Sequence, residues 1–367
     1  MALDSPFGAN RFSPIPRHAL ARRPRGAPLV NCRTARFHLS VRHDGYTPHD
    51  PSAERAAGQE ELRVRRDDVE FAGHAGNLLR GWLYLPAGDQ PAPGLVMAHG
   101  LSATKEMALD DFAEVFADAG FCVLVYDHRN LGASDGLPRQ EINPWAQARD
   151  YRHAIGWLSE RPEGDGDRIG IWGSSFSGGE VIVVGACDER VKAVVANVPF
   201  AALGGDIDYS EPAARFEAMR EALFDESGSG LADSEKGPVV GPIAVVDETG
   251  DGRPVFLPQP ESKEWFLRRG GEPESRWRNQ ITIRNAFGTD PVYDPGVCID
   301  RIAPTPLLMV VATEDRLAST ADARAAFERA GEPKRLELIE GHHFTPYDGE
   351  PLARAAAATR AFLLEYL

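Results

Sequence analysis

Short apolar runs and longer amphipathic segments alternate along the chain from residue 67 onward. Continuous apolar runs predict buried strands, whereas apolar residues at every third or fourth position predict helices. The strands expected in the first half of the chain are 69–72, 78–85, 94–98, 121–126, 169–171 and 191–196. The helices expected among them cover 107–119, 144–160 and the apolar residues 181–184. The first two strands predict an antiparallel hairpin around 74–77. The alternation that follows predicts an α/β fold with a mostly parallel, twisted sheet covered by helices on both faces.

The alternation stops between residues 200 and 297. This segment has loops rich in Gly and Pro, an amphipathic stretch at 213–224 and an aromatic stretch at 263–267. It also predicts a hairpin, with strands at 243–246 and 255–257 around the turn Thr249-Gly250-Asp251-Gly252. The earlier rhythm returns with strands at 306–312 and 335–339 and helices at 320–330 and 352–367. We interpret 200–297 as an insertion between a first part of the core, 61–199, and a second part, 298–367.

Composition separates the N-terminal region from the rest. The chain has 367 residues, of which 43% are hydrophobic, enough for a large core. Its net charge of −15 argues against nucleic acid or an anionic membrane as a partner. The first 42 residues hold eight arginines and one acid, Asp4, so they carry +7 against −22 for the remainder. We expect residues 1–60 to be a disordered or loosely packed tail. A transit peptide, or a start codon placed too far upstream, would have a similar composition.

Other features of the sequence bear on the cellular compartment and on metal binding. No run is long enough to span a bilayer and the N-terminus lacks a secretory apolar region, so we expect a cytoplasmic protein. The four cysteines form no C-x-x-C pair, which favours buried thiols over disulfides or metal ligands; they are Cys32, Cys122, Cys187 and Cys298. His99 has no second ligand at a metal spacing, so we interpret it as structural and expect neither metal nor cofactor. The oligomeric state stays open, a homodimer included.

Residues 167–180 contain the strongest candidate chemistry. The apolar strand around Ile171 is followed by a turn of serines and glycines and then by an apolar helix. Ser175 stands at the apex of this turn, which has the pattern G-x-S-x-S-G-G where the stricter nucleophile elbow is G-x-S-x-G. Ser174 is flanked by large residues and Ser177 would lie within the helix, so we prefer Ser175 as nucleophile. Taken alone, the motif could also be a serine-rich turn without chemistry.

Two later strands end in residues that could activate this serine. A serine hydroxyl is a weak nucleophile at neutral pH and needs a histidine base oriented by a carboxylate. The strand at 307–312 runs into Glu314-Asp315, and the strand at 336–339 runs into His342-His343. Active-site groups gather at the carboxyl ends of parallel strands, and the order serine, acid, histidine is a known triad order. Within each pair the spacing alone leaves both members open.

An oxyanion would need backbone N–H donors close to Ser175. We expect one donor at Phe176, directly after the nucleophile, and the other at Leu101, in the loop after the strand at 95–98. The run at 127–136 follows another strand and lacks the Gly-Lys-Ser/Thr ending of a phosphate loop. We interpret it as a structural turn in which Arg129 tethers loops.

Taken together, these motifs resemble the α/β-hydrolase superfamily, and within it the dienelactone-hydrolase-like serine hydrolases. The motifs that carry the resemblance are His99-Gly100, Asp127-x-Arg129-x-x-Gly132-x-Ser134-x-Gly136, the elbow at Ser175, Glu314-Asp315 and Gly341-His342-His343-Phe344. The resemblance favours Asp315, the shorter carboxylate one position further along, and His343, because the family pattern Gly-Gly-His-Phe has a glycine where His342 stands. Dienelactone hydrolases proper use a cysteine nucleophile, and Ser175 departs from that.

A narrower resemblance is to polyketide transferases and thiohydrolases of natural-product pathways. It rests on the elbow sequence at 172–179, on Trp277-x-Asn279-x-x-Thr282 and on Thr305-Pro306-Leu307-Leu308-Met309. The superfamily resemblance also implies that the insertion is a cap over the active site. Its aromatic residues could line an acyl pocket or form the core of the cap; they are Tyr209, Phe216, Phe224, Phe256, Trp265, Phe266, Trp277, Phe287 and Tyr293.

The sequence therefore predicts a metal-free serine hydrolase that cleaves a carboxylic ester or thioester of a small acyl substrate. One alternative keeps Ser175, His343 and Asp315 but transfers the acyl or polyketide group to an acceptor other than water. A second alternative is a binding protein that keeps the fold without catalysis. The same triad would also serve a peptidase or a carbon–carbon hydrolase.

Overall fold

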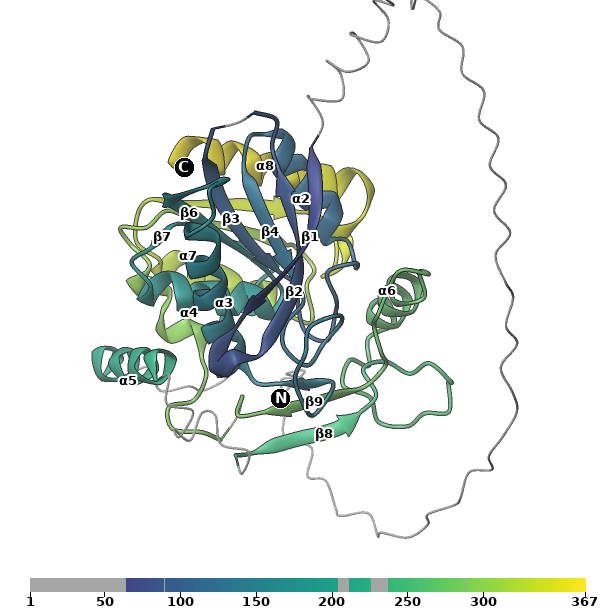
Figure 1. Cartoon of the computed structure of the whole chain (residues 1–367). Coiled ribbons are helices and arrows are strands. Elements are labelled where there is room, and N and C mark those ends of the chain that lie inside the picture. The colour runs from purple at the N-terminus through teal and green to yellow at the C-terminus, as the bar shows by residue number, and fades with distance from the viewer. Residues whose placement is uncertain (1–63, 89, 204–210, 226–236, 287) are drawn as a thin grey trace, which may run out of the picture. The chain divides into compact units, whose positions relative to one another are not determined.

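The computed structural model describes residues 64–88, 90–203, 211–225, 237–286 and 288–367 (Figure 1). All of them belong to one compact unit, Glu61–Leu367. The expectations for residues 1–60, for Cys32 and for the aromatic residues Tyr209 and Phe287 lie outside the described residues.

The core of the described chain is an eight-stranded sheet in the order β1-β2-β4-β3-β6-β7-β10-β11. Its strands are β1 (Arg65–Ala72), β2 (Leu78–Leu85), β3 (Ala92–Ala98), β4 (Cys122–Tyr126), β6 (Gly164–Ser174), β7 (Val191–Asn197), β10 (Leu307–Ala312) and β11 (Lys334–Ile339). The pairs β1–β2 and β2–β4 are antiparallel and all other pairs are parallel. The predicted opening hairpin and the mostly parallel α/β sheet are therefore confirmed.

Helices cover both faces of this sheet (Figure 1). They are α2 (Leu109–Asp118), α3 (Pro144–Ser159), α4 (Phe176–Cys187), α7 (Thr320–Arg329) and α8 (Gly349–Tyr366). Helices α2 and α8 pack against each other, and α3 packs against α4. Helix α4 is buried all around, as its unbroken apolar run Val181, Ile182, Val183 and Val184 requires. The chain enters α3 through Asn143, whose side chain accepts hydrogen bonds from the backbone N–H groups of Trp145 and Ala146.

The region predicted as an insertion contributes two helices, α5 (Pro212–Phe224) and α6 (Pro260–Gly270). It also contributes most of a three-stranded sheet in the order β5-β9-β8, formed by β5 (Glu141–Ile142), β9 (Ile281–Arg284) and β8 (Val239–Ile243). The amphipathic stretch at 213–224 is confirmed as α5. The small sheet was not anticipated, because two of its strands are only two and four residues long.

The predicted hairpin between 243–246 and 255–257 is wrong. The two segments meet in a single parallel bridge, Ala244 with Val255, and β8 pairs instead with β9. One reason is that the side chain of Asn279 occupies the backbone groups of Val246: its Oδ1 accepts from Val246 N–H at 2.9 Å and its Nδ2 donates to Val246 O at 2.9 Å. A second is Pro254, which has no N–H to offer an antiparallel ladder.

Three of the four cysteines lie within the described residues, and Cys122, Cys187 and Cys298 are all buried free thiols, as expected. No helix among the described residues is both long and apolar enough to cross a bilayer.

Candidate active site

Ser175 lies between the end of β6 and the first residue of α4, in a strained backbone conformation with φ 55° and ψ −112°. A non-glycine residue is rarely found at positive φ, so neighbouring contacts must hold it there. Ser175 N–H donates to Asn197 O at 2.8 Å, and Phe200 N–H donates to Ser175 O at 2.8 Å. Both partners lie at or just beyond the end of β7, so the adjacent strand fixes the elbow from both sides.

Two glycines make room for this turn. A Cβ on Gly173 would lie 2.1 Å from Ser177 O, and a Cβ on Gly100 would lie 2.8 Å from the Cβ of Ser175. The first approach is between β6 and the start of α4, and the second is between the loop after β3 and Ser175. Glycine at both positions therefore allows Ser175 to be approached closely by backbone.

The structure brings Ser175, His343 and Asp315 into one hydrogen-bonded chain. His343 Nε2 lies 2.9 Å from Ser175 Oγ, and His343 Nδ1 lies 2.6 Å from Asp315 Oδ2. The other carboxylate oxygen, Asp315 Oδ1, accepts from the N–H groups of Leu317 and Ala318 at 2.8 and 2.9 Å. Because a carboxylate oxygen only accepts, Nδ1 carries the proton and the lone pair of Nε2 faces the serine hydroxyl.

The sheet order explains why Ser175 and His343, 168 positions apart in sequence, meet here. Strands β6, β10 and β11 run parallel within the same half of the sheet, so their carboxyl ends lie along one edge. Ser175 follows β6, Asp315 follows β10 and His343 follows β11. His343 is 2% exposed and Asp315 is 7% exposed, while Ser175 is half-buried and reachable.

The competing residues are placed differently. Glu314 and His342 are exposed, whereas Ser174 and Ser177 are buried. His342 Nδ1 accepts from Phe344 N–H at 3.2 Å, within its own loop. The hydroxyl of Ser174 is hydrogen-bonded to that of Tyr347, which ties the end of β6 to the loop that carries His343.

The two expected oxyanion donors also lie beside Ser175. Phe176 is the first residue of α4, where a backbone N–H has no partner within the helix. Leu101 follows Gly100, whose backbone passes directly against the nucleophile. Leu101 N–H donates to no atom among the residues that the structure describes.

Helix α6 of the insertion packs on the loop that carries His343. The ring of Trp265 stacks on that of Phe344, with centroids 4.9 Å apart. The guanidinium of Arg269 donates to Tyr347 O at 3.2 Å and to Asp348 Oδ1 at 2.7 Å. Phe344 in turn meets the ring of His343 edge-on at 5.0 Å. Aromatic residues of the insertion therefore support the histidine loop, a role that the sequence did not indicate.

Other insertion aromatics make protein contacts of their own. Phe216 and Phe224 lie beneath arginine guanidinium groups, Trp277 stacks on Phe266 at 5.4 Å, and Tyr293 meets Trp145 edge-on at 5.0 Å. In the first part of the core, Arg129 Nε donates to Asp150 Oδ2 at 2.6 Å and its Nη2 donates to His74 O at 2.9 Å. Arg129 therefore tethers loops, as the sequence predicted.

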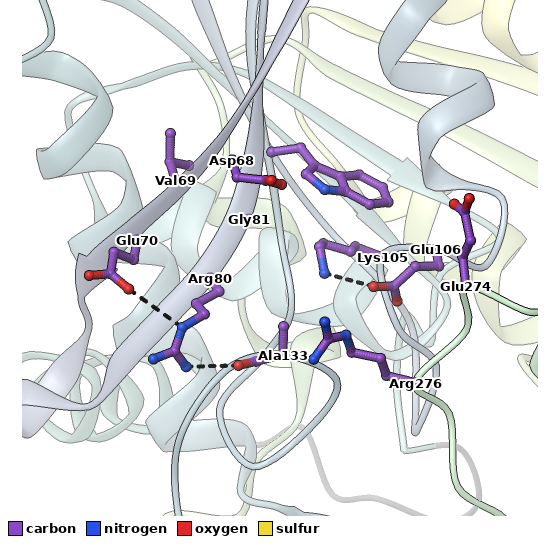
Figure 2. A pocket seen from close by; sticks show the side chains of 11 residues that line it. Asp68, Val69, Glu70, Arg80, Gly81, Lys105, Glu106, Ala133, Glu274 and Arg276 are labelled. Carbon is purple, nitrogen blue, oxygen red and sulfur yellow. Dashed lines mark hydrogen bonds and ion pairs between the residues drawn. The ribbon is translucent and has the colours of Figure 1, made fainter. Parts of the chain in front are cut away.

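A cavity of about 490 Å³ opens at another place, between the β1–β2 hairpin, the loop after β3 and the insertion (Figure 2). Its lining is strongly charged and comprises Asp68, Val69, Glu70, Arg80, Gly81, Trp82, Lys105, Glu106, Ala133, Glu274 and Arg276. Lys105 Nζ pairs with Glu106 at 2.8 Å and with buried Asp127 at 2.8 Å, while Arg80 pairs with Glu70 at 3.5 Å and with Asp135 at 2.6 Å. These two cations are therefore engaged within the protein.

Comparisons with known proteins agree with this fold. The family model described as X-Pro dipeptidyl-peptidase (S15 family) matches residues 75–345. That range begins in the first hairpin and includes Ser175, Asp315 and His343. The chain belongs to this family of α/β hydrolases.

The chain is also similar to individual members of the α/β-hydrolase superfamily. The polyketide transferase af380 of Aspergillus fumigatus is 32% identical over 307 residues, which are 83% of this chain and 99% of that protein. The thiohydrolase aneE of Aspergillus aculeatus is 32% identical over 288 residues, 75% of this chain and 86% of that protein. The crystal structure of the α/β hydrolase GrgF from Penicillium sp. superposes with a TM-score of 0.63 at 30% identity, covering 82% of this chain and 99% of that one. Both resemblances predicted from the sequence are confirmed, and the chain is an enzyme of a hydrolase or polyketide transferase group.

The glycine at the elbow gives a first testable prediction. Gly173→Ala would place a Cβ against the rigid backbone oxygen of Ser177, so we expect the free energy of unfolding to fall by about 3 kcal/mol. Gly156→Ala is the matched control, because its Cβ would meet only the end of the Arg190 side chain, and a helix-interior alanine should stabilise by up to about 1 kcal/mol. Urea unfolding measures both. Equal midpoints for the two variants would show that the elbow is not tightly packed.

Proposed function

We propose that this α/β hydrolase is a serine hydrolase that cleaves a carboxylic ester or thioester through an acyl-enzyme on Ser175. The observation that carries the proposal is the hydrogen-bonded chain from Asp315 through His343 to Ser175. Its polarity is set by an acceptor at one end of the imidazole and a donor at the other: the Asp315 carboxylate fixes the proton on Nδ1, and Nε2 accepts the hydrogen bond, and later the proton, of the Ser175 hydroxyl. The names of the relatives, a thiohydrolase and a polyketide transferase, supply the acyl thioester as a substrate class.

In the first half of the reaction, Ser175 Oγ attacks the carbonyl carbon while His343 Nε2 takes its proton. Asp315 stabilises the imidazolium, since its Oδ2 receives the Nδ1–H bond and its Oδ1 is fixed by two backbone N–H groups. The N–H groups of Phe176 and Leu101 stabilise the oxyanion, each contributing about 10²–10³-fold to kcat in comparable enzymes.

The tetrahedral intermediate then collapses. The C–O or C–S bond to the leaving group breaks, and His343 returns its proton to the departing alcohol or thiol. In the second half His343 removes a proton from water, and the hydroxide oxygen attacks the acyl carbon. The bond between the acyl carbon and Ser175 Oγ then breaks, and His343 returns the proton to Ser175 Oγ as the acid product leaves. Each proton taken by His343 is returned in the same half-reaction, so no cofactor enters the balance.

Labelling and turnover test the triad. A fluorophosphonate probe should label the wild-type protein at one site, and Ser175→Ala should abolish both labelling and hydrolysis of p-nitrophenyl esters. We expect Asp315→Asn to lower kcat by about 10³–10⁴-fold, because the amide no longer fixes the Nδ1–H tautomer.

The neighbouring acid supplies a matched control. Glu314→Gln changes the exposed member of the Glu314-Asp315 pair and should leave kcat within about twofold, as exposed surface substitutions do. Stoichiometric labelling that survives in Ser175→Ala, or a wild-type protein that takes up no probe, would contradict the proposal. The second result would favour a binding protein that has the fold alone.

A second candidate function keeps the same acyl-enzyme but transfers the acyl group to an acceptor other than water. The observation that favours it is the similarity to the polyketide transferase af380 over 83% of this chain. The chemistry of Ser175, His343 and Asp315 is the same for either acceptor, because His343 can deprotonate an alcohol as well as water. What distinguishes the two functions is therefore the acceptor, not the triad.

Partitioning of the acyl-enzyme tests this point. A panel of p-nitrophenyl esters and acyl thioesters of increasing chain length is incubated with and without an added alcohol, and the products are separated by mass. A hydrolase gives mainly the free acid with a rate independent of the alcohol. Labelling by the probe with almost no acid formed, and an ester product that appears only with the alcohol, would reject hydrolysis in favour of transfer. An X-Pro p-nitroanilide in the same panel examines peptidase activity.

A further inference from the structure

Ser177 occupies the elbow position where the stricter motif has a glycine, and its hydroxyl contacts three polar groups. Its Oγ lies 2.6 Å from His99 O, 2.7 Å from His128 Nε2 and 2.8 Å from Glu180 Oε2. The three partners come from the ends of β3 and β4 and from α4. The group is sealed from solvent, with exposures of 1% for Ser177, 2% for His128 and 0% for Glu180.

Hydrogen accounting fixes the direction of each bond. Ser177 has one hydroxyl proton, and His99 O can only accept, so the proton goes to that carbonyl. Ser177 Oγ then accepts from His128 Nε2–H and from Glu180, which requires a protonated carboxyl. Burial favours the neutral forms: it raises the pKa of Glu180 well above its usual range and lowers the pKa of His128 well below its own. His128 Nδ1 faces no acceptor among the described residues, so nothing there would hold a proton on it, which agrees with the neutral Nε2–H tautomer.

The ring of His99 is also held in a neutral form. Its Nδ1–H donates to Gly100 O at 2.9 Å, and its Nε2 accepts from the backbone N–H of His128 at 3.1 Å. Burial lowers the pKa of His99. The separation of 3.8 Å between Nε2 and Asp127 Oδ1 is therefore not an ion pair. The carbonyl of His99 is therefore held by Ser177, and its ring is held by the backbone of Gly100 and His128.

This network bears directly on the nucleophile. His99 is followed by Gly100, which passes within van der Waals reach of Ser175, and then by Leu101, whose N–H is the proposed oxyanion donor. A shift of the His99 carbonyl would move the peptide planes that follow it. Ser177 lies two residues after Ser175 on α4, so its hydroxyl bridges the elbow and the oxyanion loop directly.

We propose that Ser177, together with His128 and a neutral Glu180, is a positioning group that fixes the 99–101 loop against the nucleophile elbow. The inference rests on the proposed function for its effect on turnover. A second nucleophilic site is excluded, since Ser177 is sealed from solvent and gives its proton to His99 O and not to the imidazole.

Removing the hydroxyl tests the proposal. Ser177→Gly restores the ordinary elbow motif and Ser177→Ala keeps a side chain, so both should fold. We expect each to lower kcat for a p-nitrophenyl ester by about 10–100-fold, with KM within about twofold. The reason is that a displaced oxyanion donor stabilises the transition state less, while the binding of substrate is unchanged. The rate of fluorophosphonate labelling at Ser175 should fall in parallel. Ser159→Ala, which removes a hydroxyl that donates to Gly156 O in α3, should change neither rate.

Substitution of Glu180 distinguishes the neutral network from a charged one. Glu180→Gln keeps a donor for Ser177 Oγ and should retain kcat within about threefold, whereas Glu180→Ala should lose about as much as Ser177→Gly. A folded Glu180→Gln as inactive as Glu180→Ala would overturn the neutral network. An unchanged kcat in both Ser177 variants, or a rise in KM alone, would overturn the positioning role.

Amide hydrogen exchange gives a readout that does not depend on activity. In Ser177→Gly we expect the amide of Ala103, which donates to Gly100 O at 3.2 Å, to exchange at least about tenfold faster than in the wild type, with exchange in β10 unchanged. Unchanged exchange at Ala103 would reject the positioning role even if turnover fell. Faster exchange together with a wild-type protein that takes up no probe would instead reject the proposed function and leave the structural role of Ser177 standing.

Discussion

The strained backbone of Ser175 is the constraint on which the rest of the site depends. A serine at positive φ between a strand and a helix is stable only if its N–H and its carbonyl are both held, and the end of β7 holds both. In this conformation the Ser175 hydroxyl lies 2.9 Å from His343 Nε2. The same conformation also brings the first turn of α4 so close to β6 and to the loop after β3 that glycine is needed at 173 and 100. The positions of the side chains in this site therefore depend on the geometry of the main chain around Ser175.

A second constraint links the site to the insertion. The histidine loop is fixed on one side by the hydrogen bond of Tyr347 to Ser174 and on the other by α6, through Trp265 on Phe344 and Arg269 on Asp348. The position of His343 therefore depends on contacts outside the core sheet. The carboxylate of Asp315 needs no such support, because it is held by backbone N–H groups of its own loop.

The sequence was informative where local physics decides the outcome. Unbroken apolar runs identified the strands of the large sheet, and small residues around Ser175 identified the elbow. Spacing alone did not separate Asp315 from Glu314 or His343 from His342; that choice came from a family resemblance, and the geometry shows the chosen members facing one another. The hairpin prediction at 243–257 failed because Asn279, more than twenty residues further along, supplies hydrogen bonds that no local pattern reveals. The network of Ser177 could not be predicted for the same reason, since His99 lies 78 positions away in sequence. The acidic residue Glu180 inside an apolar helix was the one feature of the sequence that pointed to a buried polar network.

The attachment of α6 to the histidine loop also affects how such an enzyme can diversify. A change on the inner side of α6 alters the packing of Phe344 and, through it, of His343, so residues on that side of α6 cannot vary independently of the loop after β11. The aromatic residues of helix α5 instead pack against arginine side chains at the surface of the core, away from the loop that carries His343. We therefore expect α6 to vary together with the loop that carries His343, as one unit, and α5 to vary independently of that loop.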